Sequence, residues 1–295
     1  MAPKDLGITL MHEHVLVDFI GADKIGPGRY DPEEAAQAAL PRLRQIQKLG
    51  CRTFVECTPA YLGRDPRLLR RLSRETGLRI LSNTGYYGAQ AGKFLPAHAR
   101  SETAQQLAAR WIAEWEQGIE GTGIRPGLLK TSVNRAPLPE MDARLIRAAA
   151  LTHKATGLTL ASHTGEGAAA LEELDMLQAE RVPADAFIWV HAQSEKDGAF
   201  HVRAAERGAW VEFDGVRDAT LDRHLALVEA MASRKLLGRV LVSQDSGWYH
   251  VGEPGGGNYR PYDFLFTHFV PKIRERLGEK AVRQLLVENP ARALA

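Results

Sequence analysis

The stretch Gly7-Ile-Thr-Leu-Met-His-Glu-His-Val15 is an apolar run that predicts a buried β-strand near the start of the chain. Successive side chains on a strand point to opposite faces, so His12 and His14 project from one face and Glu13 from the other. Imidazole nitrogens are good ligands for zinc and similar divalent ions. Two of them held side by side on a rigid strand supply half of a metal site, and the rest of the chain must supply the other half.

Seven further apolar runs follow, separated by stretches with helical signals. Asp31 before Pro32 and Asp65 before Pro66 mark helix starts, because Asp caps the first turn and Pro fits the first helical position. Eight buried strands alternating with helices favour an α/β fold of the (β/α)8 TIM barrel type, and no Gly-x-Gly-x-x-Gly follows the first strand to suggest a dinucleotide-binding sheet. We predict a single barrel domain over residues 1–295. The predicted strands are 7–15, 53–58, 79–84, 127–133, 158–163, 186–191, 209–214 and 239–244.

Composition narrows the class of protein. The chain has 38 basic and 36 acidic residues, a formal net charge of +2, which gives no electrostatic case for binding nucleic acid or an anionic membrane. No run approaches the ~18 apolar residues of a membrane span, and the first residues do not form a secretory signal. Cys51 and Cys57 flank a buried-looking strand, so we expect core residues rather than a disulfide. We therefore expect a cytoplasmic enzyme acting on a small molecule.

Further candidate metal ligands fall at the ends of predicted strands. His163 ends the fifth strand, His191 the sixth and Asp245 the eighth, while Lys130 lies within the fourth. Catalytic residues converge at the carboxyl ends of the strands in a barrel of this kind, so these side chains should meet His12. The other six histidines are expected on loops or helix faces: His98, His153, His201, His224, His250 and His268.

Lys130 lies between apolar residues on its strand, where a charged amine is unfavourable. A neutral amine has two uses. It could form a Schiff base with a carbonyl substrate, as in a lyase, or it could add carbon dioxide to become a carbamate whose oxygens bridge two metals. The histidines predicted nearby favour the carbamate.

Several segments together resemble the phosphotriesterase-like branch of the amidohydrolase superfamily, which comprises binuclear metal hydrolases. The resemblance runs through nearly the whole chain in the family's order. The segments are Thr9-Leu-Met-His-Glu-His14, Leu62-Gly-Arg-Asp-Pro66, Gly127-Leu-Leu-Lys-Thr131, Ser162-His-Thr164, Val190-His191, Ser243-Gln-Asp245 and Glu288-Asn-Pro-Ala-Arg292.

The resemblance implies a role for each candidate residue. His12, His14 and Asp245 would hold one divalent ion, and His163 and His191 the other. Carboxylated Lys130 and a hydroxide would bridge them. Zinc is the first expectation for both ions, with manganese, cobalt or iron as alternatives. Tyr87 matches a substrate-contacting aromatic position, and a homodimer is also implied.

The segments around the predicted pocket differ from that family in one respect. Gly215 stands where phosphotriesterases tend to carry histidine and the related lactonases arginine, so neither specific activity transfers directly. The Gly-rich segment 246–261 follows the last strand and carries Trp248 and Tyr249, which predicts a substrate lid with aromatic surface. We expect Trp248 and Tyr87 to bind substrate in an apolar pocket.

The predicted function is metal-dependent hydrolysis of an ester-type bond by a metal-bridging hydroxide, with Asp245 accepting the proton. Carboxylic esters or lactones are the leading substrates. A phosphotriesterase acting on organophosphate or phosphonate esters is the alternative, and a Schiff-base lyase on Lys130 is a distant third.

Overall fold

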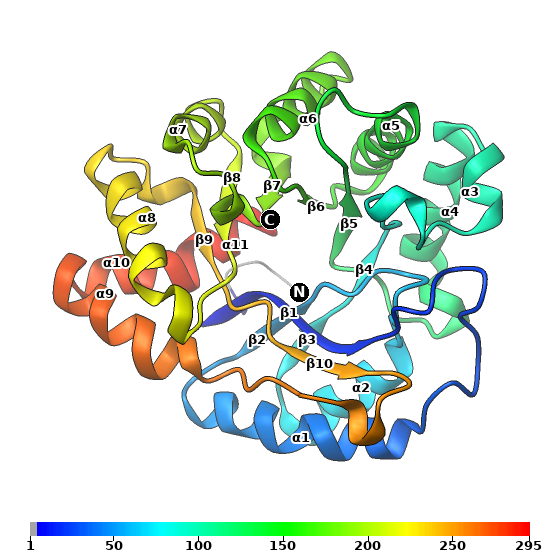
Figure 1. Ribbon diagram of the computed structural model, residues 1–295, viewed down its shortest axis with the longest axis horizontal. Coiled ribbons are helices and arrows are strands. Elements are labelled where there is room, and N and C mark those ends of the chain that lie inside the picture. The colour runs from blue at the N-terminus through cyan, green and yellow to red at the C-terminus, as the bar shows by residue number, and fades with distance from the viewer. Residues whose placement is uncertain (1–4) are drawn as a thin grey trace.

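The computed structural model describes residues 5–295 and shows a ring of parallel strands surrounded by helices (Figure 1). All nine residues of the first strand are buried, as expected for a strand covered on both faces. The predicted barrel is therefore confirmed, with strand ends that shift by up to about two residues. The strands are β1 Thr9–Val17, β2 Thr53–Glu56, β3 Arg79–Leu81, β4 Asn83–Thr84, β5 Leu128–Ser132, β6 Leu160–His163, β7 Phe187–Val190, β8 Trp210–Phe213, β9 Val240–Val242 and β10 Gly247–His250.

The strands pair in chain order and the ring closes between the last and the first. β1 pairs with β2 and β2 with β3, while β4 to β9 form a continuous parallel sheet. β3 and β4 are the two halves of one predicted strand, interrupted at Ser82. Closure comes from the segment after β9, where Asp245 N donates to His12 O at 3.1 Å and Ser243 Oγ accepts from His12 N at 2.9 Å. Closing the barrel thus brings Asp245 beside β1.

The helices form the outer layer, and two of them begin at the predicted caps. Asp31 accepts a hydrogen bond from Glu33 N at 2.8 Å, and Asp65 accepts from Arg67 N at 2.8 Å. The helices are α1 Pro32–Lys48, α2 Pro66–Thr76, α3 Ala97–Ser101, α4 Ala104–Gln117, α5 Glu140–Thr156, α6 Gly167–Ala179, α7 Gly198–Glu206, α8 Leu221–Ser233, α9 Val270–Leu277, α10 Glu279–Arg283 and α11 Asn289–Ala293.

The barrel interior is filled with apolar side chains at one end. Met11, Leu128 and Trp210 belong to a buried cluster that also contains Ala293 from α11. Leu128 and Trp210 are the first residues of β5 and β8, so α11 covers the amino-terminal end of the barrel. Polar chemistry is therefore confined to the opposite end, where the strands finish.

The segment 246–261 holds a strand that the sequence did not predict. β10 pairs in parallel with β1 on the side opposite β2, with Gly247 opposite His14. A Cβ at Gly247 would lie 1.8 Å from His14 O, so the close backbone approach requires glycine there. The segment is therefore partly anchored to the barrel. Across residues 5–295, none of the helices has the length and apolar character needed to span a membrane.

Candidate metal centre

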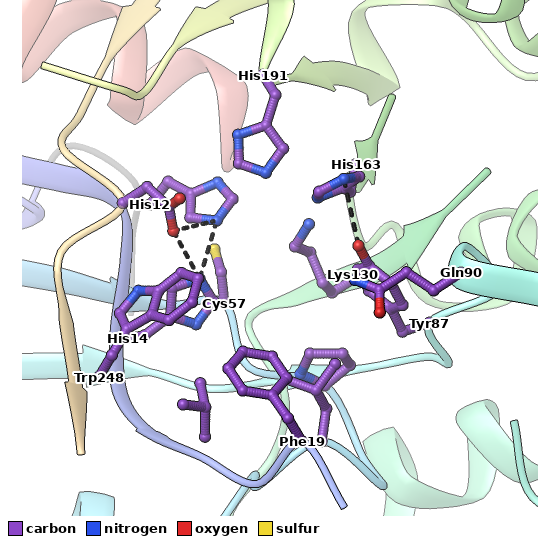
Figure 2. Close-up of a pocket in the computed structure, with 14 residues that line it drawn as sticks. His12, His14, Phe19, Cys57, Tyr87, Gln90, Lys130, His163, His191 and Trp248 are labelled. Atoms are coloured by element: carbon purple, nitrogen blue, oxygen red, sulfur yellow. Dashed lines mark hydrogen bonds and ion pairs between the residues drawn. The ribbon is translucent and has the colours of Figure 1, made fainter. Parts of the chain in front are cut away.

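β1 presents His12 and His14 to the same space, as their alternation on the strand predicts. His12 Nε2 lies 3.2 Å from His14 Nε2. Asp245 Oδ1 lies 3.1 Å from His14 Nε2 and 3.9 Å from His12 Nε2. The two rings and the carboxylate are buried or nearly so, and in Figure 2 both rings face the cavity beside Cys57 and Trp248.

Oxygen atoms behind the two rings favour a proton on each Nδ1. His14 Nδ1 is 2.8 Å from Thr58 Oγ1, and because that hydroxyl can donate to Leu16 O it accepts from the ring. His12 Nδ1 faces Asp214 Oδ2 at 3.3 Å. Each Nδ1 therefore carries a proton when the ring is neutral, which leaves both Nε2 atoms with lone pairs.

Three atoms thus converge that can each offer an electron pair to a cation when the two rings are neutral. The ligand atoms of His12, His14 and Asp245 all lie within 4.8 Å of one another. Asp245 Oδ1 is buried and finds no hydrogen-bond donor among residues 5–295. A cluster of two imidazole lone pairs and a carboxylate oxygen is unfavourable alone and suits a divalent cation, so the residues fit the first predicted metal.

His163 and His191 form a second pair across the cavity. Their ring centroids are 4.2 Å apart. His191 Nδ1 donates to Asp214 Oδ1 at 2.6 Å, which leaves its Nε2 free to bind, and the Tyr87 hydroxyl contacts His163 Nε2 at 3.2 Å, which leaves Nδ1. Both rings point inward (Figure 2), so they fit the second predicted metal.

The pKa shifts of His163 and Asp214 favour the forms needed for metal binding, whereas that of His12 does not: burial would lower the pKa of His12, but acidic side chains nearby raise it well above its usual value. Burial, together with the charges of His191 and Lys130, lowers the pKa of His163 well below its usual value. Burial alone would raise the pKa of Asp214, but the charges of His191 and His12 lower it well below the usual range. A neutral His163 and an ionised Asp214 are the states needed for binding metal and for holding its ligands.

Lys130 lies between the two histidine pairs. The residue is 2 % exposed on β5, and its amine points into the space shared by the rings (Figure 2). The structure thus brings all six predicted ligand residues to one cavity of about 210 Å³. Its other walls are apolar or aromatic except at Gln90, a polar residue that the sequence did not single out. They are Val17, Phe19, Cys57, Pro59, Leu62, Tyr87 and Trp248.

Two of the three predicted aromatic residues line this cavity. Tyr87 and Trp248 are in its wall, and the Trp248 ring packs against Phe19 with centroids 5.6 Å apart. Tyr249 is not in the lining; it is 4 % exposed and packs beside Gly256 in the apolar core. The prediction that Tyr249 faces the substrate is therefore wrong, because adjacent residues of β10 point to opposite sides.

Glu13, which points away from the cavity, holds the backbone around Asp245. Its carboxylate accepts from Ser246 N at 2.7 Å, Gln244 N at 3.1 Å and Ser243 Oγ at 2.8 Å. Asp245 itself has a φ of 50°, a strained backbone conformation for a residue with a side chain. The middle residue of His12-Glu13-His14 thus positions a ligand that follows the last barrel strand.

Two histidines differ from expectation. His201 and His224 are 2 % and 1 % exposed rather than on open helix faces. His201 Nε2 contacts Ala192 O at 2.7 Å, and His224 Nδ1 contacts Thr220 O at 2.9 Å. Asp214, like Glu13, has a role that sequence reasoning missed, although Asp214 directly follows a strand as His191 does.

Comparison with known proteins identifies what the chain resembles. The model of the phosphotriesterase family matches residues 1–294. A phosphotriesterase homology protein of Escherichia coli is 30% identical over 97% of both chains, and an N-acetyltaurine hydrolase of Danio rerio is 23% identical over 99% of this chain and 95% of its own. A solved variant of the organophosphorus hydrolase from Deinococcus radiodurans superimposes with a TM-score of 0.87 at 28% identity, covering 100% of this chain and 95% of that one.

Proposed function

The chain belongs to the phosphotriesterase family of hydrolases, and from this premise we propose that it hydrolyses carboxylic esters or lactones with two divalent ions. One observation carries the proposal: four strands or strand ends deliver four imidazoles and a carboxylate around the buried amine of Lys130, which lies on a fifth strand. Two of the three proteins compared are named as hydrolases and none as a lyase, so the Schiff-base alternative for Lys130 has no support from them.

His12, His14 and Asp245 would hold one ion, and His163 with His191 the other, with carboxylated Lys130 contacting both. Zinc is the metal that we propose first, with manganese, cobalt or iron as alternatives. Bound ions of this kind lower the pKa of water towards neutrality and polarise a carbonyl oxygen, which supplies both a nucleophile and an electrophile for ester hydrolysis.

Asp245 is placed to take the proton released during the reaction. Burial would raise the pKa of this carboxyl, but the histidine side chains around it, His14 foremost, hold the pKa below its usual value, so the group is ionised near neutral pH. Its side chain is 23% exposed at the cavity mouth, unlike that of His12, which is 1% exposed. A proton accepted there can leave towards solvent.

The apolar wall orients the substrate. Phe19, Leu62 and Trp248 offer a surface for a hydrocarbon part of the ester, while the Tyr87 hydroxyl lies next to His163. Excluding water from this wall strengthens the electrostatic interactions of the reacting groups. An uncharged acyl or alcohol group would be held there with its carbonyl towards the histidines.

Organophosphate ester hydrolysis is the second candidate, since the organophosphorus hydrolase is similar over the whole chain. An aryl ester, a lactone, an N-acetyl amide and a dialkyl aryl phosphate, tested on metal-loaded protein, separate the possibilities. We expect kcat/KM for the aryl ester or lactone to exceed that for the phosphate by at least ~10-fold, about 1.4 kcal/mol of transition-state stabilisation. A preference for the phosphate would establish the second candidate, and no hydrolysis of any of the four would overturn both.

A further inference from the structure

A second cavity of about 380 Å³ opens beside the metal centre. It shares His163, His191 and Asp245 with the first cavity and extends outward to the start of α8. The two cavities therefore meet at the proposed ligands. The outer walls are formed by Gly165, Gln193, Ser194, Gly215, Arg217, Thr220, Arg223 and His224.

The outer wall carries two guanidinium groups without an acidic partner. Within residues 5–295, neither Arg217 nor Arg223 forms an ion pair with a carboxylate, whereas Arg110 is paired with Glu102 on the same protein. Arg223 donates to the carbonyl of Gln193, which fixes it at the cavity wall. Asp245, a proposed metal ligand, supplies the cavity's carboxylate, so the outer part of the cavity is positively charged.

His224 adds an unused hydrogen-bonding atom to the same wall. Its Nδ1 lies 2.9 Å from Thr220 O, and a carbonyl oxygen can only accept, so Nδ1 carries the proton. Nε2 is buried and has no partner in the described part of the chain. The neutral ring is thus able to accept a hydrogen bond from an O–H or N–H group of a ligand.

Gly215 lets the His224 ring lie close to the backbone at the cavity wall. A Cβ at this position would lie 2.9 Å from Gln193 Nε2 and 3.4 Å from His224 Nε2. Gly215 is not among the residues with positive φ, so its backbone conformation does not require glycine. The consequence of glycine here is that Gln193 and the His224 ring can pack close against this stretch of backbone at the cavity wall.

We propose that the outer cavity binds the acidic end of the substrate, a carboxylate or sulfonate, against Arg217 and Arg223. The inference rests on the proposed function, because the bond to be cleaved then lies over the metal centre while the hydrocarbon part occupies the apolar cavity. Guanidinium groups bind planar oxyanions with paired hydrogen bonds, and the unused Nε2 of His224 takes a hydroxyl or amide N–H nearby. The substrate is thus an ester, lactone or amide that carries an acid.

Binding without turnover tests the cavity alone. Metal-loaded protein is titrated with 3-hydroxybenzoate and with phenol, which share the ring and hydroxyl but differ in the acid. We expect the acid to bind at least ~10-fold more tightly, and the double variant Arg217→Ala/Arg223→Ala to lose that difference. Arg147→Ala, an exposed arginine on α5, is the matched control and should retain it. Equal binding of both probes, or a preference that survives the double variant, would overturn the proposal.

Turnover tests the cavity and the proposed function together. Phenyl butyrate is compared with its 3-carboxyphenyl ester, and 4-nitrophenyl pentanoate with the 4-nitrophenyl ester of glutaric acid. We expect the acidic member of at least one pair to have the higher kcat/KM, and the ratio to fall ~10-fold or more in the double variant. If no ester is cleaved but the acid still binds through the arginines, the proposed function fails and the acid site stands. If esters are cleaved and the acidic member has no advantage in kcat/KM in either pair, the proposed acid site is refuted while the proposed function stands.

Discussion

Asp245 combines two proposed roles, metal ligand and proton acceptor, in a single carboxylate. Asp245→Asn keeps the size of the side chain and removes the ability to take a proton. We expect kcat to fall ~10²–10⁴-fold with little change in KM, as for the loss of a general base. Metal content measured on the same samples separates the two roles: a variant with full metal and near-normal turnover would assign proton transfer to another residue.

The proposed role of Lys130 depends on carboxylation of its side-chain amine. Carboxylation would turn a buried amine into an anion between two cations, so Lys130→Ala should lose both metal and activity. Adding a short carboxylic acid such as propionate should restore part of the activity by occupying the vacated space. Lys154→Ala on the exposed face of α5 is the control. Mass spectrometry or a crystal structure showing an unmodified Lys130 in metal-loaded protein would contradict the assignment.

The residues that sequence reasoning found share one property: they are polar side chains interrupting or ending apolar runs. His163, His191 and Asp245 could be predicted for that reason. Asp214 and Glu13 were missed because their importance lies in what they touch, namely ring nitrogens and backbone amides from segments distant in the sequence. Hydrogen-bond partners of this kind are set by barrel closure, which no local pattern encodes.

At the scale of elements, the residue that follows β8 contacts histidines from two other strands. Asp214 accepts a hydrogen bond from Nδ1 of His191 and faces Nδ1 of His12. Asp214→Asn would offer one acceptor in place of two and should weaken metal binding ~10–100-fold. Equilibrium dialysis against buffered zinc measures this, with the exposed neighbour Asp218→Asn as control. Unchanged affinity would mean that the strands alone orient the rings.

The contact between α6 and β6 makes the stability of the fold depend on pH. Glu173 accepts from Ser162 and Thr164 on either side of His163, and burial raises its pKa to about 8. The folded state therefore binds this proton more tightly than the unfolded state. The resulting stability is full below pH 4.5, the ordinary pKa, and is lost as the pH rises towards 8.

Glu173→Gln removes this titration and should flatten the stability profile between those pH values, where the wild-type slope can reach about 1.4 kcal/mol per pH unit. Urea unfolding at a series of pH values, at fixed metal content, measures the difference. Glu206→Gln, an exposed residue on α7, should leave the profile unchanged. Parallel profiles for wild type and Glu173→Gln would show that another group titrates.

Helices and barrel strands could be predicted because short stretches of sequence indicate them. Caps such as Asp31 mark helix starts, and apolar runs mark buried strands. β10 could not be predicted. Its four residues begin with Gly247, whose approach to His14 O depends on the position of β1, and the surrounding glycines suggested an irregular lid. Because β10 was not predicted, its register was unknown, and the register of a strand decides which side chains face inward. Tyr249 was therefore wrongly predicted to line the pocket.

For the whole molecule, six ligand residues predict close to two divalent ions per chain. Elemental analysis of protein purified without chelators should find them, and the double variant His163→Ala/His191→Ala should retain at most one. Because the sites are formed by the folded barrel, each ion at 100 times its Kd should add about 2.7 kcal/mol of stability. Chelation should thus lower the thermal midpoint, and zinc should restore it. Wild-type protein that binds no ion when supplied with metal and bicarbonate would refute the two-metal centre.

The contacts of β1 with segments far later in the chain have a consequence for how the protein is made. His12 N bonds to Ser243 Oγ, a partner 231 residues away, and β10 pairs alongside β1. During synthesis the two histidines of β1 emerge from the ribosome well before Asp245, the carboxylate proposed to complete their site. The nascent chain therefore carries an incomplete chelating pair while the residues between them are translated, and the metal centre can assemble only after Asp245 has emerged.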